Sequence, residues 1–130
     1  LLSAVTAYPN LQAKNVQPQF TLSEYSIDAE VSNKVLSPGY ISEIKGTLKY
    51  KGINEVKLTI REKNSNGTYT QKLTDVNVSL PENDDKFTVD LSNSFKAESG
   101  KTYIFSFVGY VNGAPVLEDK CTVVGGYISK

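Results

Sequence analysis

The chain has 130 residues, a length that fits one domain with a single hydrophobic core. Its 14 basic and 14 acidic residues cancel and are spread along the sequence, which argues against a nucleic-acid partner, and no apolar run is long enough to span a bilayer. With no histidine and a single cysteine, the chain lacks His-based catalysis, the usual Cys/His metal sites and an internal disulfide, so we expect a non-enzymatic protein without a cofactor.

The first 19 residues show no strand or helix period, so we expect an irregular N-terminal arm ahead of one domain at residues 20–130. Leu1 to Ala7 is apolar, does not begin with Met and ends in Val-Thr-Ala, a pattern typical of the residues before a secretory cleavage site. Residues 1–19 are therefore interpreted as a signal-peptide remnant or an arm. Secretion or display at the cell surface is the expected location, and a fragment of a longer protein is the alternative.

Apolar and polar residues alternate from Tyr25 onward, which predicts half-buried β-strands. The first strand covers residues 25–31 and is followed by a Ser-Pro-Gly turn at residues 37–39. Two further strands follow at residues 40–50 and 56–61, separated by Lys-Gly at residues 51–52. We expect these two strands to form a hairpin.

A strong turn signal at residues 64–67, Asn-Ser-Asn-Gly, leads into a strand at residues 68–80 that we expect to break near Asp75. Alternation resumes at residues 87–91 as a short strand. Residues 92–99 have weak helical phasing, and we expect at most one short helical turn there.

Residues 100–124 carry the clearest pattern in the chain, because alternation is interrupted only by Asn112-Gly113, which predicts a β-hairpin. The side chains expected on its core face are Tyr103, Phe105, Phe107, Val111, Leu117, Cys121 and Val123. In all, about seven strands at 8–12-residue spacing predict an all-β fold, a two-sheet antiparallel sandwich.

The start of this hairpin resembles the penultimate strand of immunoglobulin-like and fibronectin type III-like domains. The resemblance is carried by residues 99–105 and by Phe107, Gly109 and Tyr110. It implies an immunoglobulin-like sandwich in which Tyr103 is a tyrosine corner, with its hydroxyl bonded to the chain near residues 95–97. The absence of Trp and of a Cys pair departs from the antibody type. The chain is also similar to small exported single-domain proteins of Gram-positive bacteria, a likeness that implies no mechanism.

Ile104, Val108 and Tyr110 fall on the opposite face of the same strand, which makes both faces apolar. A contiguous apolar patch on a protein surface usually marks an interface, so these three residues are the candidate binding site. The alternatives are that the arm or the Tyr127-Ile128 tail covers them, or that a bulge near Gly109 shifts the strand phase.

The densest cluster of oxygen ligands is the segment Glu82, Asn83, Asp84 and Asp85. It is a candidate Ca²⁺ loop, but its spacing matches no EF-hand, and a polar turn between strands is the favoured interpretation. Cys121 is in phase with Val123, so we expect it to fill the core and not to be reactive.

These observations favour an exported or cell-surface binding module that recognises a protein or a surface polymer such as a glycan, with weak homodimerisation as one form of partner. Three alternatives stay open. The chain could be a structural spacer of a surface protein, a glycan binder with a tyrosine platform, or a secreted enzyme inhibitor that presents residues 63–69 or 81–86 to a cleft.

Overall fold

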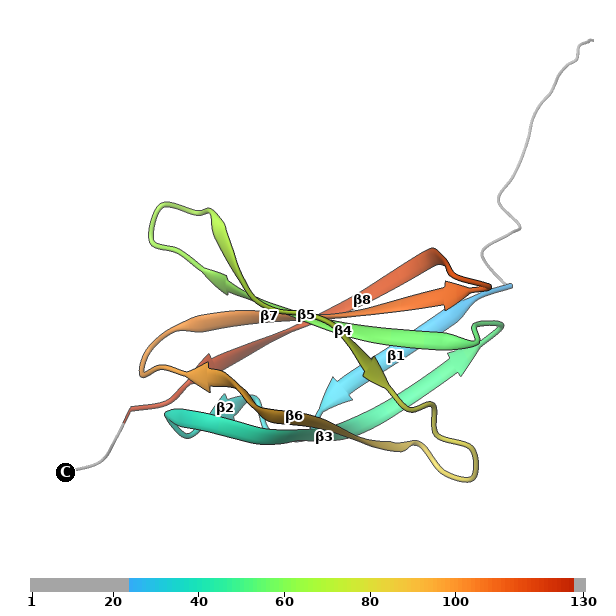
Figure 1. Ribbon diagram of the computed structural model, residues 1–130, viewed down its shortest axis with the longest axis horizontal. Helices are drawn as coiled ribbons and strands as arrows, with labels where there is room; N and C mark the ends of the chain where they lie inside the picture. Colours follow the sequence, from blue (N-terminus) through green and yellow to red (C-terminus); the bar gives the residue numbers. More distant parts are fainter. Residues whose placement is uncertain (1–23, 128–130) are drawn as a thin grey trace, which may run out of the picture.

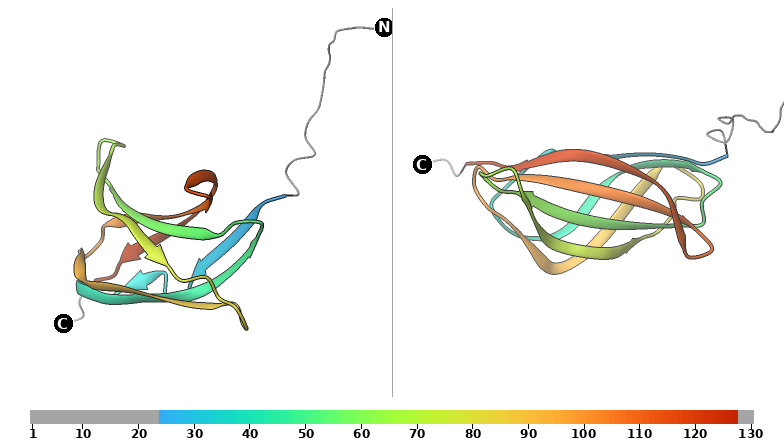
Figure 2. Two further views of the ribbon diagram at one scale, coloured as in Figure 1. Left: turned by 45° about the vertical axis from the view of Figure 1, so that its right-hand side comes forward. Right: turned by 90° about the horizontal axis from the view of Figure 1, so that it is seen from above.

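The computed structural model describes residues 24–127, which form two β-sheets that face each other as in a β-sandwich (Figures 1 and 2). The strands are β1 Ser26–Val31, β2 Val35–Leu36, β3 Gly39–Lys51, β4 Glu55–Lys63, β5 Tyr69–Val78, β6 Lys86–Ala97, β7 Thr102–Val111 and β8 Ala114–Gly125. One sheet has the order β1-β3-β6 and the other β2-β8-β7-β4-β5. The predicted all-β, two-sheet class is confirmed, and the predicted arm lies outside the described residues. Among residues 24–127, no helix has the length and hydrophobicity to cross a membrane.

The predicted purely antiparallel pairing is wrong at one edge of the larger sheet. Strand β2 pairs with β8 in parallel, with Val35 opposite Val124. Backbone bonds fix this edge, because Val124 N donates to Lys34 O at 2.9 Å and Gly126 N donates to Leu36 O at 2.8 Å. The chain crosses from the smaller sheet to the larger one between β1 and β2. A strand of two residues has no alternation from which it could be predicted.

The predicted hairpin between β3 and β4 is also wrong, because the two strands belong to different sheets. Strand β3 pairs with β1 and β6, whereas β4 pairs with β5 and β7. The connection carries Gly52 at a φ of 80° and Ile53, which is only 6% exposed and anchors the crossing in the core. Alternation predicts which face of a strand is buried but not which strand lies beside it.

No helical turn forms at residues 92–99, because β6 continues through Ala97 after a bulge. Ser92 and Asn93 have φ values of 50° and 53°, and Ser92 N donates to Asp90 Oδ1 at 2.8 Å. The bulge separates the pairs Ile41–Phe95 and Glu43–Asp90 in the register with β3. The strand then resumes with Phe95 buried in the core, which explains why the sequence pattern is irregular there.

The predicted turns and strand break are confirmed. Asn112 and Gly113 have φ values of 51° and 85°, as a tight hairpin turn requires. Residues 64–67 turn the chain between β4 and β5, and Asp75, with a φ of 54°, interrupts the β5 register.

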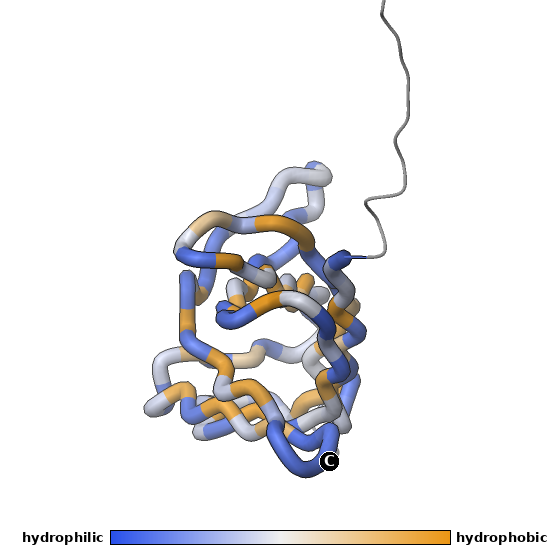
Figure 3. The backbone as a smooth tube through the Cα atoms, turned by 90° about the vertical axis from the view of Figure 1, so that its right-hand side faces the viewer, coloured by the Kyte–Doolittle hydropathy of each residue, from blue (hydrophilic) through white to orange (hydrophobic). Residues whose placement is uncertain are grey.

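The core lies between the two layers, and hydrophobic positions alternate with hydrophilic ones along the strands that enclose it (Figure 3). Tyr103, Phe105 and Phe107 from β7 are fully buried, as predicted. Phe95 of the smaller sheet meets the Tyr103 ring edge-on, with 5.0 Å between ring centroids. Such edge-to-face pairs add to the free energy gained from burial itself.

Replacing Phe105 with Ala tests the observed strand phase. Loss of a fully buried aromatic ring should lower the free energy of unfolding by about 3–5 kcal/mol in urea denaturation. The control, Val108→Ala, removes a partly exposed side chain of the same strand and should cost about 1 kcal/mol or less. Equal losses from the two variants would contradict the assigned faces.

Candidate functional site

The three residues predicted as a binding patch lie on the outer face of the larger sheet, and all three are partly exposed. Ile104 sits between Arg61 of β4 and Thr122 of β8, and Val108 between Lys57 and Glu118 of the same two strands. The patch is therefore a row of apolar side chains along β7, interrupted by the buried Ser106 and with polar and charged side chains on both sides. We call this surface, formed by β4, β7 and β8, the outer face.

A bulge near Gly109, foreseen as an alternative, is present. The register between β7 and β8 shifts between Gly109 and Tyr110. The shift places Tyr110 opposite Pro115, where Lys57 Nζ lies 5.1 Å from the Tyr110 ring centroid. Cation–π contacts of this kind hold an exposed ring in a defined orientation. Tyr110 thus remains at the outer face.

The second alternative is that the N-terminal arm or the Tyr127-Ile128 tail covers the outer face. The tail is described as far as Tyr127, which packs against Gly100 at the turn before β7 and is 83% exposed. Its described part therefore lies at one end of the strand and away from Val108 and Tyr110. The arm and Ile128 are outside the described residues.

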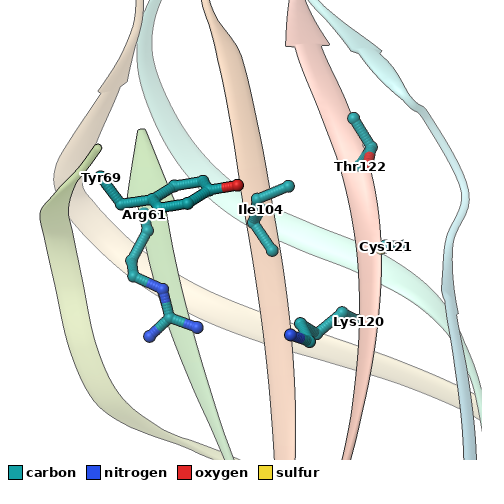
Figure 4. A pocket seen from close by; sticks show the side chains of 6 residues that line it. All are labelled: Arg61, Tyr69, Ile104, Lys120, Cys121 and Thr122. Carbon is teal, nitrogen blue, oxygen red and sulfur yellow. The ribbon is translucent and has the colours of Figure 1, made fainter. Parts of the chain in front are cut away.

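The outer face contains a hollow of about 290 Å³ around Ile104 (Figure 4). Its lining is formed by Arg61, Tyr69, Ile104, Lys120, Cys121 and Thr122. The Tyr69 ring reaches from β5 across β4, with its hydroxyl toward Ile104, and the Lys120 side chain reaches from β8 toward β7. An apolar floor is thus combined with two cations and two hydroxyl groups.

The two cations of the hollow differ in their partners. Arg61 Nη2 donates to Ser106 Oγ at 3.0 Å and lies 3.8 Å from Glu118 Oε2, so its guanidinium is held across β7. Lys120 is exposed and takes part in none of the ion pairs among residues 24–127. Its charge is therefore available to a ligand.

Sequence reasoning missed Arg61 and Tyr69 as site residues. Arg61 belongs to a strand that was treated only as scaffold, and Tyr69 was considered only as the last residue of the candidate inhibitor loop at residues 63–69. The turn at residues 64–67 was nevertheless a usable signal, because a hairpin there places Tyr69 opposite Lys63, as observed. The position of β4 beside β7, which brings Arg61 to Ile104, has no local signal.

The acidic segment Glu82, Asn83, Asp84 and Asp85 forms an exposed turn between β5 and β6. Asp84 Oδ1 accepts the Lys86 N–H at 3.0 Å, and Leu48 N donates to Asp85 O at 2.6 Å. Within the described chain, no three His, Cys, Asp or Glu side chains are placed to hold a metal ion. These bonds favour the interpretation as a polar turn, since Asp84 is already used to close it.

Tyr103 makes the hydrogen bond that the resemblance implied, one residue further along. Glu98 N donates to the Tyr103 hydroxyl oxygen at 2.8 Å. Burial raises the pKa of Tyr103, and this bond opposes the rise in part. This bond connects the turn after β6 to the start of β7, the strand that carries the candidate patch.

Beside this turn lies a buried carboxylate that no sequence pattern distinguishes from the other acidic residues. The Glu62 side chain is 10% exposed, with Lys72 Nζ at 3.6 Å and Lys101 Nζ at 3.5 Å. Through these two ion pairs, the Glu62 carboxylate connects β4 with β5 and with the turn before β7.

Cys121 is partly buried and packs against the core, in agreement with its expected role. Burial raises the pKa of its thiol, with the Val31 backbone and the Lys34 charge acting in the opposite direction. At neutral pH the thiol therefore stays protonated, and only the thiolate is an effective nucleophile.

Comparison of the sequence with models of protein families gives no match, and comparison with curated proteins gives none either.

The Tyr103 bond leads to a pH-dependent prediction. Tyr103→Phe should lower the free energy of unfolding by about 1 kcal/mol at neutral pH, because the Glu98 N–H loses its acceptor. The folded pKa is raised, so the unfolded chain loses this proton first, near pH 10.0, and the wild type loses stability as the pH rises further. The difference between the two proteins in urea denaturation should then shrink. A difference that stays constant would argue against a raised pKa.

The Cys121 thiol should react slowly in the folded protein. Alkylation by iodoacetamide near pH 8 should be several-fold slower than in urea, since burial raises the folded pKa above 9.0 and limits access. Mass spectrometry over time measures both rates. Equal rates in the folded and unfolded protein would show that the thiol is open to solvent.

Proposed function

We propose that this protein is a non-catalytic, exported or cell-surface binding module that recognises a protein or a surface polymer through the outer face. The observation that carries the proposal is the apolar line along β7, part-exposed and beside a hollow with two cations. Apolar contact area bordered by polar groups is the usual composition of a recognition surface.

The chemistry of the titratable groups supports a non-catalytic role. Burial raises the pKa of Tyr103 and of Cys121, which keeps both groups protonated at neutral pH. A catalytic site usually combines a shifted acid or base with a neighbouring charge in a cleft. Tyr103 and Cys121 both pack in or against the core, and Cys121, which also lines the hollow, carries a protonated thiol that is a poor nucleophile.

The proposal includes an immunoglobulin-like or fibronectin type III-like kinship for the sandwich. Two features support it: the Tyr103–Glu98 bond at the turn into β7, and a larger sheet in which β8, β7 and β4 are neighbours. Domains of this architecture commonly act at cell surfaces, which agrees with the secretory pattern of the first residues.

A secreted enzyme inhibitor is the second candidate function. The β4–β5 hairpin projects from the body of the sandwich (Figures 1 and 2). Its turn is held by side-chain bonds, because Asn64 Nδ2 donates to Thr68 Oγ1 at 2.9 Å and to Thr70 Oγ1 at 3.0 Å. A stiff projecting turn suits insertion into an enzyme cleft, since little entropy is lost on binding.

A display experiment tests the outer face without a known partner. Peptides selected from a random library against the wild-type protein should mostly lose binding to an Ile104→Thr, Val108→Thr variant, because its apolar line is gone. They should keep binding to Tyr40→Thr, which alters an exposed residue of β3 in the other sheet.

Circular dichroism checks that both variants fold, and sedimentation equilibrium shows whether the wild type self-associates through the same face. Peptides that bind both variants equally would contradict the proposed surface. Peptides that lose binding when residues 64–68 are substituted would favour the inhibitor. Failure to select any peptide would favour a spacer.

A further inference from the structure

The hollow on the outer face has an excess of positive charge, although the whole chain is neutral. Arg61 is partly balanced by Glu118, whereas Lys120 has no ion-pair partner within the described chain. Lys63, exposed at the end of β4, lies opposite Tyr69 in the register and adds a further cation. A group bound at this position would therefore be favoured if it carried negative charge.

The spacing of the outward side chains along β7 matches that of an extended polypeptide ligand. Ile104, Ser106 and Val108 are alternate residues of one strand, so they repeat at about 6.6–6.8 Å along β7. Alternate side chains of an extended polypeptide repeat at the same distance. Along β7, the outward surface is apolar at Ile104 and again at Val108. Between them it is cationic, because Arg61 is bonded to Ser106 and Lys120 lies opposite Ser106.

We propose that the outer face binds an extended acidic segment of a partner polypeptide, with a carboxylate between Arg61 and Lys120 and apolar side chains two residues before and after it. This inference rests on the proposed function and specifies its ligand. A polypeptide is favoured over an acidic glycan because one aromatic ring, Tyr69, lines the hollow, and aliphatic side chains form its floor and its continuation. Sugar rings are held mainly by stacking on aromatic faces, whereas aliphatic contacts suit apolar side chains.

The probe is a capped pentapeptide with the sequence leucine-serine-glutamate-serine-leucine, and the control probe has glutamine in place of glutamate. We expect the acidic peptide to shift the amide resonances of Ile104, Ser106 and Thr122 in ¹⁵N-labelled protein, and the glutamine peptide to bind about two- to fivefold more weakly. Added salt should reduce this difference, since the charges are near the surface.

Matched variants locate the charge effect. Lys120→Gln should weaken binding of the acidic peptide by about two- to fivefold and leave the glutamine peptide unchanged. Lys49→Gln makes the same change of net charge at an exposed position of β3 in the other sheet and should have no effect. Both lysines are on the surface, so the variants are expected to fold, and their spectra verify it.

The outcomes separate this inference from the function on which it depends. Equal affinity for the two peptides, shifts that map away from the hollow, or no binding would overturn the acidic-segment proposal. The outer face itself would still stand if library peptides discriminated the Ile104→Thr, Val108→Thr variant. Tighter binding of a hyaluronate oligosaccharide than of the acidic peptide, with the same resonances shifted, would overturn the polypeptide assignment in favour of a glycan.

Discussion

The packing of one aromatic strand against the opposite sheet is the constraint on which the structure depends. Tyr103, Phe105 and Phe107 of β7 are fully buried, and Phe95 of β6 meets the first two edge-on, with centroid distances of 5.0 and 6.1 Å. Strand β7 is central in its sheet, between β8 and β4. Its inward side chains therefore fix the spacing of the two sheets, and its outward ones define the outer face.

The edges of the sandwich are closed by polar contacts. Asp119 Oδ2 of β8 accepts the Ala29 N–H of β1 at 2.8 Å, which joins an edge strand of the smaller sheet to the larger sheet. At the other end, Glu62 contacts Lys72 and Lys101, and Glu98 N donates to the Tyr103 hydroxyl. These contacts orient strands that hydrophobic burial alone would leave free to slide, because burial is not directional.

The same arrangement supports the proposed recognition at the outer face. A strand held rigidly by its inner side chains presents its outer ones at fixed spacing, so a ligand loses less entropy in ordering the site. The cation–π contact between Lys57 and Tyr110 and the hydrogen bond from Arg61 to Ser106 reduce the conformational freedom of the Lys57 and Arg61 side chains. The surface is in this sense preorganised, while Lys120 remains available.

Local sequence patterns are sufficient to predict the all-β class, the β7–β8 hairpin with its Asn112-Gly113 turn, and the outward position of Ile104 and Val108. These properties follow from alternation and turn chemistry, which are local. Tertiary packing, by contrast, places β3 and β4 in different sheets, joins β2 to β8 in parallel, and brings Arg61 and Tyr69 together at Ile104. The reason is that strand partners are selected by packing between residues distant in the chain, and alternation is the same whichever partner a strand takes.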